Sequence, residues 1–159
     1  MGRFYGTPFK VNDRVMEIKE HTISSLSLGH EESILVHVTP EDVVRFAALS
    51  GDVSPLHVDE EFARSRGFGS CVAHGMLIGS YVSALVGTRL PGRHGIMQAC
   101  ELMFRSPLVP PATLTVTGAV TNISESTGQV TIKITVKNGD GRVLTSGVVK
   151  SIIRTPAPN

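Results

Sequence analysis

The chain has 159 residues, which suits a single domain large enough to bury a hydrophobic core. Its 15 basic and 14 acidic residues give a net charge of +1 and are dispersed along the sequence, so no charged block indicates nucleic acid or a membrane surface as a partner. The two cysteines, Cys71 and Cys100, are too few for a disulfide framework and are predicted to be buried free thiols.

Neither a secretion signal nor a membrane anchor is expected. Residues 1–10 lack the apolar core of a signal peptide. No apolar run reaches the roughly 18 residues that a transmembrane helix requires. The sequence therefore predicts a soluble, cytoplasmic protein.

The first part of the chain divides into a weakly patterned stretch and the start of a domain. Residues 1–32 have mixed polarity, and we expect them to form an N-terminal extension that packs on a domain spanning residues 33–156. The domain is predicted to begin with a strand over 34–38. A helix follows from Thr39, where a threonine cap, a proline and two acidic residues make a typical helix start, and Gly51 ends it.

Two further helices are predicted before the last strands. The first is short, covers residues 59–66, and is closed by Gly67. The second runs from about Gly75 to Thr88 and contains no charged side chain. Because it is apolar all round, protein must surround it on nearly every side.

The second half of the chain changes to a period of two. Strands are predicted over 96–105, 114–120, 130–137 and 142–154, and the alternation is clearest in the third, where aliphatic residues alternate with threonine and lysine. Residues 138–141, Asn-Gly-Asp-Gly, make a favourable hairpin turn. A buried helix followed by antiparallel strands with one apolar face predicts an α+β domain in which a sheet packs around the helix.

Asp52 and His57 are the candidate chemical groups of the chain. A regular helix would turn residues five apart about 140° away from each other. Pro55, however, disfavours the helical region for Ser54, so the segment is predicted to be a turn. A turn can bring a carboxylate and an imidazole to one small volume, where they can orient a water molecule and exchange protons with it. The alternative is structural, because aspartate in a turn commonly bonds to its own backbone.

The sequence around this pair is more specific than the pair alone. It runs FAALSGDVSPLHVD over residues 46–59 and continues, after an interval, with His74-Gly75-Met76. These segments resemble the MaoC-like family of (R)-specific enoyl-CoA hydratases, whose pattern is close to S-G-D-x-N-P-x-H followed by H-G-M; Ser54 stands where that family most often has asparagine. The resemblance implies a hot-dog fold, with an antiparallel sheet wrapped around a long central helix, and a homodimer whose sheets join edge to edge.

The resemblance also implies a reaction. Water adds to C3 of a trans-2-enoyl thioester while C2 receives a proton, which gives the (3R)-3-hydroxyacyl product. Asp52 is implied as the base that activates the water, and His57 as the group that holds the water and shares the proton transfer. Gly75, at the amino end of the buried helix, is expected to offer its backbone N–H to the oxyanion that develops on the thioester. The simpler possibility is that Gly75 only lets two elements pack closely.

The expected substrate is an acyl-CoA thioester, or the same acyl group on an acyl-carrier protein, with the acyl chain along the central helix. No cofactor and no metal are expected, because hydration of an activated enoyl thioester needs neither. His74 is predicted to shape the turn into the helix rather than to complete a metal site with Asp52 and His57. Ser50 and Ser54 are predicted to be turn ligands rather than nucleophiles.

Two other functions remain open at this point. One is a hot-dog acyl-CoA thioesterase, which the spacing of Asp52 and His57 does not favour. The other is a non-catalytic module that binds acyl thioesters. The remaining histidines have no motif around them and are predicted to be ordinary surface or core residues: His21, His30, His37 and His94.

Overall fold

The computed structural model of the protein describes residues 10–11, 14–15 and 17–154. The expected extension over residues 1–32 therefore lies partly outside the described residues. Within it, β1 (Lys10–Val11) and β2 (Arg14–Val15) pair antiparallel, and a 3₁₀ turn, η1 (Ile23–Ser25), precedes the main sheet.

The centre of the molecule is a five-stranded antiparallel sheet in the order β3-β5-β6-β7-β4. Its strands are β3 (Glu31–Val38), β4 (Gly95–Phe104), β5 (Ala112–Ser124), β6 (Gln129–Asn138) and β7 (Val143–Ile153). The alternation predicted for the third run is confirmed on β6, where Ile132 and Ile134 are fully buried and Lys133 is exposed. Because the antiparallel sheet curves around a single helix, the predicted α+β, hot-dog architecture is confirmed.

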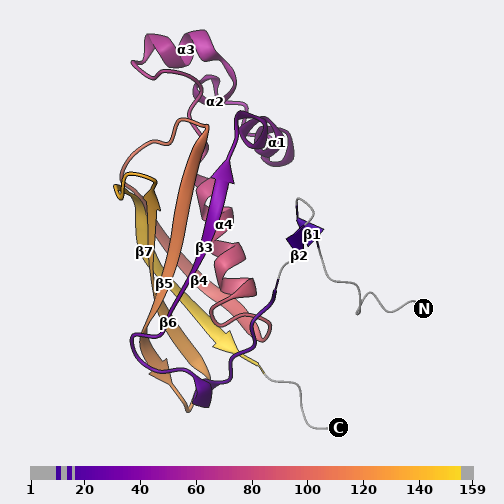
Figure 1. Ribbon diagram of the computed structural model, residues 1–159, viewed down its shortest axis with the longest axis vertical. Coiled ribbons are helices and arrows are strands. Elements are labelled where there is room, and N and C mark those ends of the chain that lie inside the picture. The colour runs from indigo at the N-terminus through magenta and orange to yellow at the C-terminus, as the bar shows by residue number, and fades with distance from the viewer. Residues whose placement is uncertain (1–9, 12–13, 16, 155–159) are drawn as a thin grey trace, which may run out of the picture.

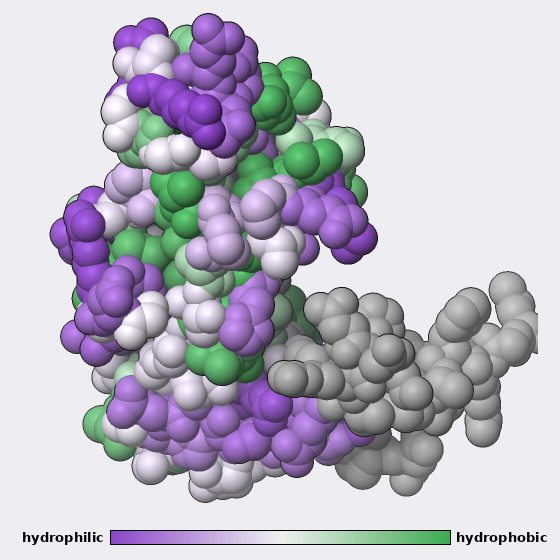
Figure 2. Space-filling view, turned by 45° about the horizontal axis from the view of Figure 1, so that its top comes forward, coloured by the Kyte–Doolittle hydropathy of each residue, from purple (hydrophilic) through white to green (hydrophobic). Residues whose placement is uncertain are grey.

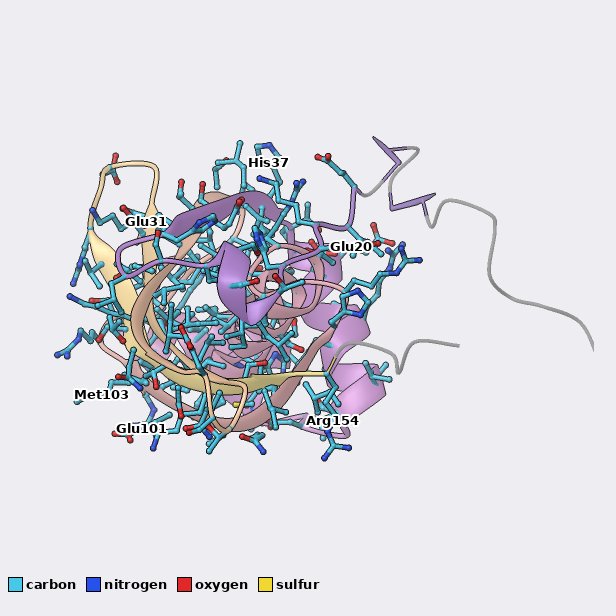
Figure 3. All side chains as sticks on the ribbon, turned by 90° about the horizontal axis from the view of Figure 1, so that it is seen from below. Glu20, Glu31, His37, Glu101, Met103 and Arg154 are labelled. Atoms are coloured by element: carbon cyan, nitrogen blue, oxygen red, sulfur yellow. The ribbon has the colours of Figure 1, made fainter. Side chains whose placement is uncertain are left out.

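The helix α4 (Gly75–Thr88) lies along the concave side of the sheet (Figure 1). Seen from below, the strands form an arc around the core side chains, with β3 (Glu31, His37) and β4 (Glu101, Met103) on opposite sides of it (Figure 3). Gly118 of β5 makes the close approach possible, because a Cβ there would lie 3.0 Å from the Leu85 side chain of α4.

The prediction that α4 is buried on nearly every side is wrong for one stripe. Six of its residues are buried, among them Val82 and Leu85 with no exposed area. Four residues along one line of the helix are exposed in the single chain, and these are Met76, Ser80, Ser83 and Gly87. Within one chain the sheet therefore covers α4 incompletely.

Three short helices cap one end of the sheet: α1 (Pro40–Ser50), α2 (Pro55–Val58) and α3 (Glu60–Ser65) (Figure 1). The predicted start of α1 is confirmed, because the Thr39 side chain accepts a hydrogen bond from the Asp42 N–H. The turn predicted around Pro55 is instead a single helical turn. Pro55 is its first residue, a position at which its missing N–H costs nothing.

The two cysteines are free, as predicted, but they are not buried. Cys71 is partly exposed, and Cys100 is exposed on the edge strand β4. The edge position explains the error, because an apolar sequence on an edge strand is not covered on both faces by its own chain. None of the helices in the described part of the chain has the length and hydrophobicity to cross a membrane.

Candidate active site

Asp52 lies just beyond the end of α1, in a loop held by local hydrogen bonds. Gly51 ends the helix in a left-handed conformation with φ of +75°. The Ser50 hydroxyl donates to the Phe46 carbonyl oxygen at 2.7 Å and accepts from the Asp52 N–H at 3.2 Å, so Ser50 is a turn ligand as predicted. Asp52 Oδ1 accepts from the Ser54 N–H at 3.2 Å, and the carboxylate is exposed. One carboxylate oxygen is thus fixed by the backbone, and no hydrogen bond is seen for the other among the described residues.

His57 is carried by α2 and is oriented by the strand-like segment before α4. Its Nδ1–H donates to the Val72 carbonyl oxygen at 2.7 Å, and the Val72 N–H donates to the Leu56 carbonyl oxygen at 3.0 Å. Because a carbonyl oxygen can only accept, the proton of the neutral ring resides on Nδ1. His57 Nε2 therefore presents a lone pair.

His74 lies directly against His57, an arrangement that the sequence did not predict. The His74 side chain is 2% exposed, and its ring stacks on the His57 ring with centroids 3.8 Å apart and planes inclined at 28°. The Phe46 ring also contacts the His74 ring, with the two ring centroids 5.0 Å apart. His74 Nε2–H donates to the backbone carbonyl oxygen of Asp52 at 2.9 Å. His74 therefore connects both candidate catalytic residues, in addition to preceding α4 as expected.

Asp52, His57 and His74 each offer a donor atom within 4.8 Å of the other two, which raises the question of a metal site. A metal ion must lie near the plane of each imidazole that binds it. Two rings stacked at 3.8 Å with nearly parallel planes cannot both meet that condition. The arrangement instead suits one water molecule between the Asp52 carboxylate and the His57 ring, since two groups at this separation can both form hydrogen bonds with it.

Gly75 is the first residue of α4, as predicted. The N–H groups of Leu77 and Ile78 both donate to the His74 carbonyl oxygen, at 3.1 and 3.4 Å. The Gly75 N–H has no acceptor among the described residues, as is usual at a helix start. A Cβ at Gly75 would lie 3.2 Å from the Phe104 ring. The structure thus leaves both expectations for Gly75 in place, an available donor and a close packing contact.

Two hollows adjoin these residues. The smaller, of about 160 Å³, is bordered by Gly75, Phe104 and Arg105. The larger, of about 520 Å³, has His57 on its wall, and most of its lining is apolar. Its lining residues are Pro40, Val43, Val44, Ala47, Ala48, Val53, His57, Val58, Glu60, Ser70, Cys71 and Pro110. In Figure 2, apolar side chains show between polar ones in the upper and middle parts of this face, whereas the lower end is largely polar.

The position of the larger hollow differs from the expected path of an acyl chain along α4. No residue of α4 lines it, and α1 supplies Val43, Val44, Ala47 and Ala48. Val82 and Leu85, which face the centre of the sheet, have no exposed area. These two residues are core, and the accessible apolar surface next to His57 belongs to α1.

Known proteins share both the sequence and the fold. A family model described as "MaoC like domain" matches residues 27–140. The chain is 35% identical to an "(R)-specific enoyl-CoA hydratase" of Rhodospirillum rubrum over 115 residues, which cover 72% of this chain and 80% of that protein. It is 30% identical to the protein of the same name from Aeromonas caviae over 132 residues, 83% of this chain and 97% of that one.

The similarity extends to solved structures. The R-hydratase PhaJ1 from Pseudomonas aeruginosa, in the unliganded form, superposes with a TM-score of 0.81 and 26% identity, covering 89% of this chain and 96% of that chain. The Aeromonas caviae (R)-hydratase involved in PHA biosynthesis superposes with a TM-score of 0.78 and 30% identity, covering 82% of this chain and 98% of that chain.

Proposed function

Since the chain belongs to the MaoC-like domain family, we propose that it catalyses the reversible (R)-specific hydration of trans-2-enoyl-CoA to (3R)-3-hydroxyacyl-CoA. One observation carries the assignment of the site: the Asp52 carboxylate and the His57 ring lie within 4.8 Å of each other beside an apolar hollow. That separation suits a single water molecule held by both groups.

The proposed reaction begins with that water. Its two hydrogens point to the Asp52 carboxylate and to the lone pair of His57 Nε2, so an oxygen lone pair faces C3 of the substrate. As the C3–O bond forms, one O–H bond breaks and Asp52 takes the proton. The electrons of the C2–C3 double bond move toward the thioester carbonyl. When they return, C2 receives a proton from the same Asp52–His57 side, which gives syn addition.

The negative charge that develops on the thioester oxygen requires a fixed donor. The Gly75 N–H is suited to this role, because it starts the 14-residue helix α4 and has no acceptor among the described residues. A preorganised donor of this kind commonly accounts for about a hundred- to thousandfold in rate. In the proposal Gly75 binds the thioester oxygen while Asp52 and His57 act on C3 and C2.

His74 acts through its neighbours rather than on the substrate. Its Nε2–H binds the Asp52 backbone, and its ring lies flat against His57. Both contacts limit the movement of the two groups that must share one water molecule. We therefore assign His74 as a positioning residue.

The acyl chain is proposed to occupy the larger hollow, whose lining is mostly apolar and includes His57. The relatives named as enoyl-CoA hydratases support an acyl-CoA substrate, and acyl-carrier-protein thioesters are a variant with the same reacting group. A cytoplasmic location, and catalysis without a cofactor or metal ion, remain predictions.

A homodimer is also proposed. The edge strand β4 is largely exposed on both faces, including Ile96 (50%) and Met103 (54%). The exposed stripe of α4 begins at Met76, which is 64% exposed. These surfaces adjoin, because α4 packs against β4 through Gly79 and Leu102. A second chain joined along β4 would cover the apolar part of both.

The test is hydration of crotonyl-CoA by the purified protein, followed as loss of the enoyl thioester absorbance, with Asp52→Asn and His57→Ala in parallel. The proposal expects (3R)-3-hydroxybutyryl-CoA from wild type and almost none from either variant. The free energy of unfolding of each variant should lie within about 1 kcal/mol of that of wild type. Release of free thiol from saturated acyl-CoA would instead indicate the thioesterase. Tight binding of acyl-CoA without turnover would indicate the non-catalytic module.

A further inference from the structure

A second group of ligand-type side chains lies at the other end of α4. His21 precedes η1, His30 directly precedes β3, and Glu32 is on β3. The Lys19 N–H donates a hydrogen bond of 2.8 Å to the carbonyl oxygen of Thr88, the last residue of α4. Since α4 has 14 residues at 1.5 Å each, this group is on the order of 20 Å along the helix from Gly75. It is therefore separate from the proposed active site.

The geometry of this group differs from that of the active-site histidines. One donor atom each of His21, His30 and Glu32 lies within 4.8 Å of the other two. The rings of His21 and His30 are 4.9 Å apart and inclined at 78°. Planes that are nearly perpendicular intersect close to both rings, so the in-plane lone pairs can be directed to one point. Stacked rings, such as those of His57 and His74, do not allow this.

His21 lies beside the backbone of Arg89 and keeps one ring nitrogen free. His21 Nε2 is buried and has no partner in the described structure. A buried nitrogen left without a partner is destabilising, so a ligand that occupied it would be stabilising. The free nitrogen of His21 is thus available to a ligand such as a metal ion.

The other two residues are held on a rigid scaffold. The His30 N–H donates to the Ser27 carbonyl oxygen, and the His30 carbonyl oxygen accepts from the Val120 N–H. His30 Nε2 lies 3.6 Å from Glu32 Oε1, about the separation of two ligands on one ion. The Glu32 side chain is only 13% exposed, and Lys19 Nζ contacts Oε1 at 2.6 Å.

We propose that His21, His30 and Glu32 bind one divalent transition-metal ion of the Zn²⁺ type. Two imidazole nitrogens and one carboxylate oxygen form a donor set that suits Zn²⁺, whereas Mg²⁺ and Ca²⁺ prefer oxygen ligands alone. The ammonium group of Lys19 holds Glu32 when no ion is bound. Its side chain is 37% exposed, so it can turn into solvent when the ion takes its place.

The bound ion would fasten the segment before η1 to β3 and to the carboxyl end of α4. Its role is structural, because the distance from Asp52 and His57 is too great for it to contact the reacting atoms. The ion would bind whether or not the protein is a hydratase, so binding can be measured without enzyme activity.

The experiment is a titration of the untagged full chain with Co²⁺, followed by visible absorption, and with Zn²⁺, followed by calorimetry. One ion per chain is expected, and saturation with Zn²⁺ is expected to raise the thermal midpoint by about 5 °C. Binding should be lost in His21→Ala and in His30→Ala. The matched control is His94→Ala, because His94 Nε2 also lies 3.6 Å from a carboxylate, that of Glu20, yet belongs to no such cluster among the described residues.

Lys19→Met provides a test that keeps all three ligands and does not depend on a variant that folds poorly. Removal of the competing ammonium is expected to tighten binding by about two- to fivefold, the usual contribution of a partly exposed ion pair. Three results would overturn the proposal: no binding by wild type, unchanged binding in His21→Ala, or loss in His57→Ala with retention in His21→Ala, which would place the ion at the active-site histidines.

Discussion

The rings of His57 and His74 stack 3.8 Å apart although the two residues are 17 positions apart in the chain. The backbone bonds between Val72 and the α2 segment bring them together, and each ring donates its one N–H to a different carbonyl oxygen. The pair therefore fixes both the position of Asp52, the proposed general base, and the free nitrogen of His57.

His74→Phe is expected to lower kcat by about fivefold or more with little change in KM. Phenylalanine keeps the stack on His57 but cannot donate to the Asp52 carbonyl oxygen, and such a hydrogen bond contributes about 1 kcal/mol. His74→Gln restores a donor near the same position and should recover most of the rate. Steady-state kinetics with crotonyl-CoA test both, and a His74→Phe variant as fast as wild type would remove the positioning role.

Gly75→Ala separates the two roles that remain for Gly75. The added methyl group would lie 3.2 Å from the Phe104 ring, which is 45% exposed and has room to move. If the Gly75 N–H binds the thioester oxygen, the methyl group should reduce kcat/KM by about a hundredfold while the protein stays folded. The double variant Gly75→Ala, Phe104→Leu relieves the packing contact. Recovery of activity in it would mean that Gly75 serves only packing.

Val44→Phe is expected to shorten the range of acyl chains that the protein accepts. Val44 lines the larger hollow from α1 and is 62% exposed, so a larger side chain can be added without disturbing the core. We expect kcat/KM for octenoyl-CoA to fall by about tenfold or more while that for crotonyl-CoA changes little. Leu49→Phe is the matched control, because Leu49 is also exposed on α1 but does not line the hollow. An equal decrease in kcat/KM for both substrates would mean that the acyl chain does not bind in the larger hollow.

Local sequence signals were sufficient for most of the fold. The Thr39 cap and the glycine at position 51 mark α1 at both ends, and the absence of charge between Gly75 and Thr88 marks α4. The alternation along β6 fixes which face of the sheet is buried. In each case the physical cause lies within one element, so a single sequence contains it.

Contacts between segments that are distant in the chain could not be predicted from such local sequence signals. The string of residues 46–59 predicts that Asp52 and His57 come together, but not that His74 stacks on His57. The same limit hid the cluster of His21, His30 and Glu32, since only the packing of two elements brings His21 to β3. The exposure of β4 escaped prediction because burial at a sheet edge depends on what lies beyond the chain.

Tyr81 should titrate far above an ordinary tyrosine. Burial, with a smaller contribution from the charge of Asp42, raises the pKa of Tyr81 to about 12. Because the folded pKa is above the unfolded value of 10.0, Tyr81 contributes stability that is complete below pH 10 and is lost as the pH rises toward 12. An absorbance titration near 295 nm should show a high-pH step that Tyr81→Phe lacks. A step of ordinary pKa lost in the variant would contradict the prediction.

Met103→Lys is expected to convert a dimer into monomers. Met103 is 54% exposed on the edge strand β4. In the proposed dimer, each chain would bury a lysine at this position in the interface along β4, which costs desolvation energy and places like charges in the interface. Leu35→Lys is the matched control on β3, the opposite edge of the sheet, where Leu35 is 66% exposed. Analytical ultracentrifugation should give twice the chain mass for wild type and Leu35→Lys, and the single mass for Met103→Lys. Dissociation by Leu35→Lys alone would move the interface to β3, and a monomeric wild type would exclude the dimer.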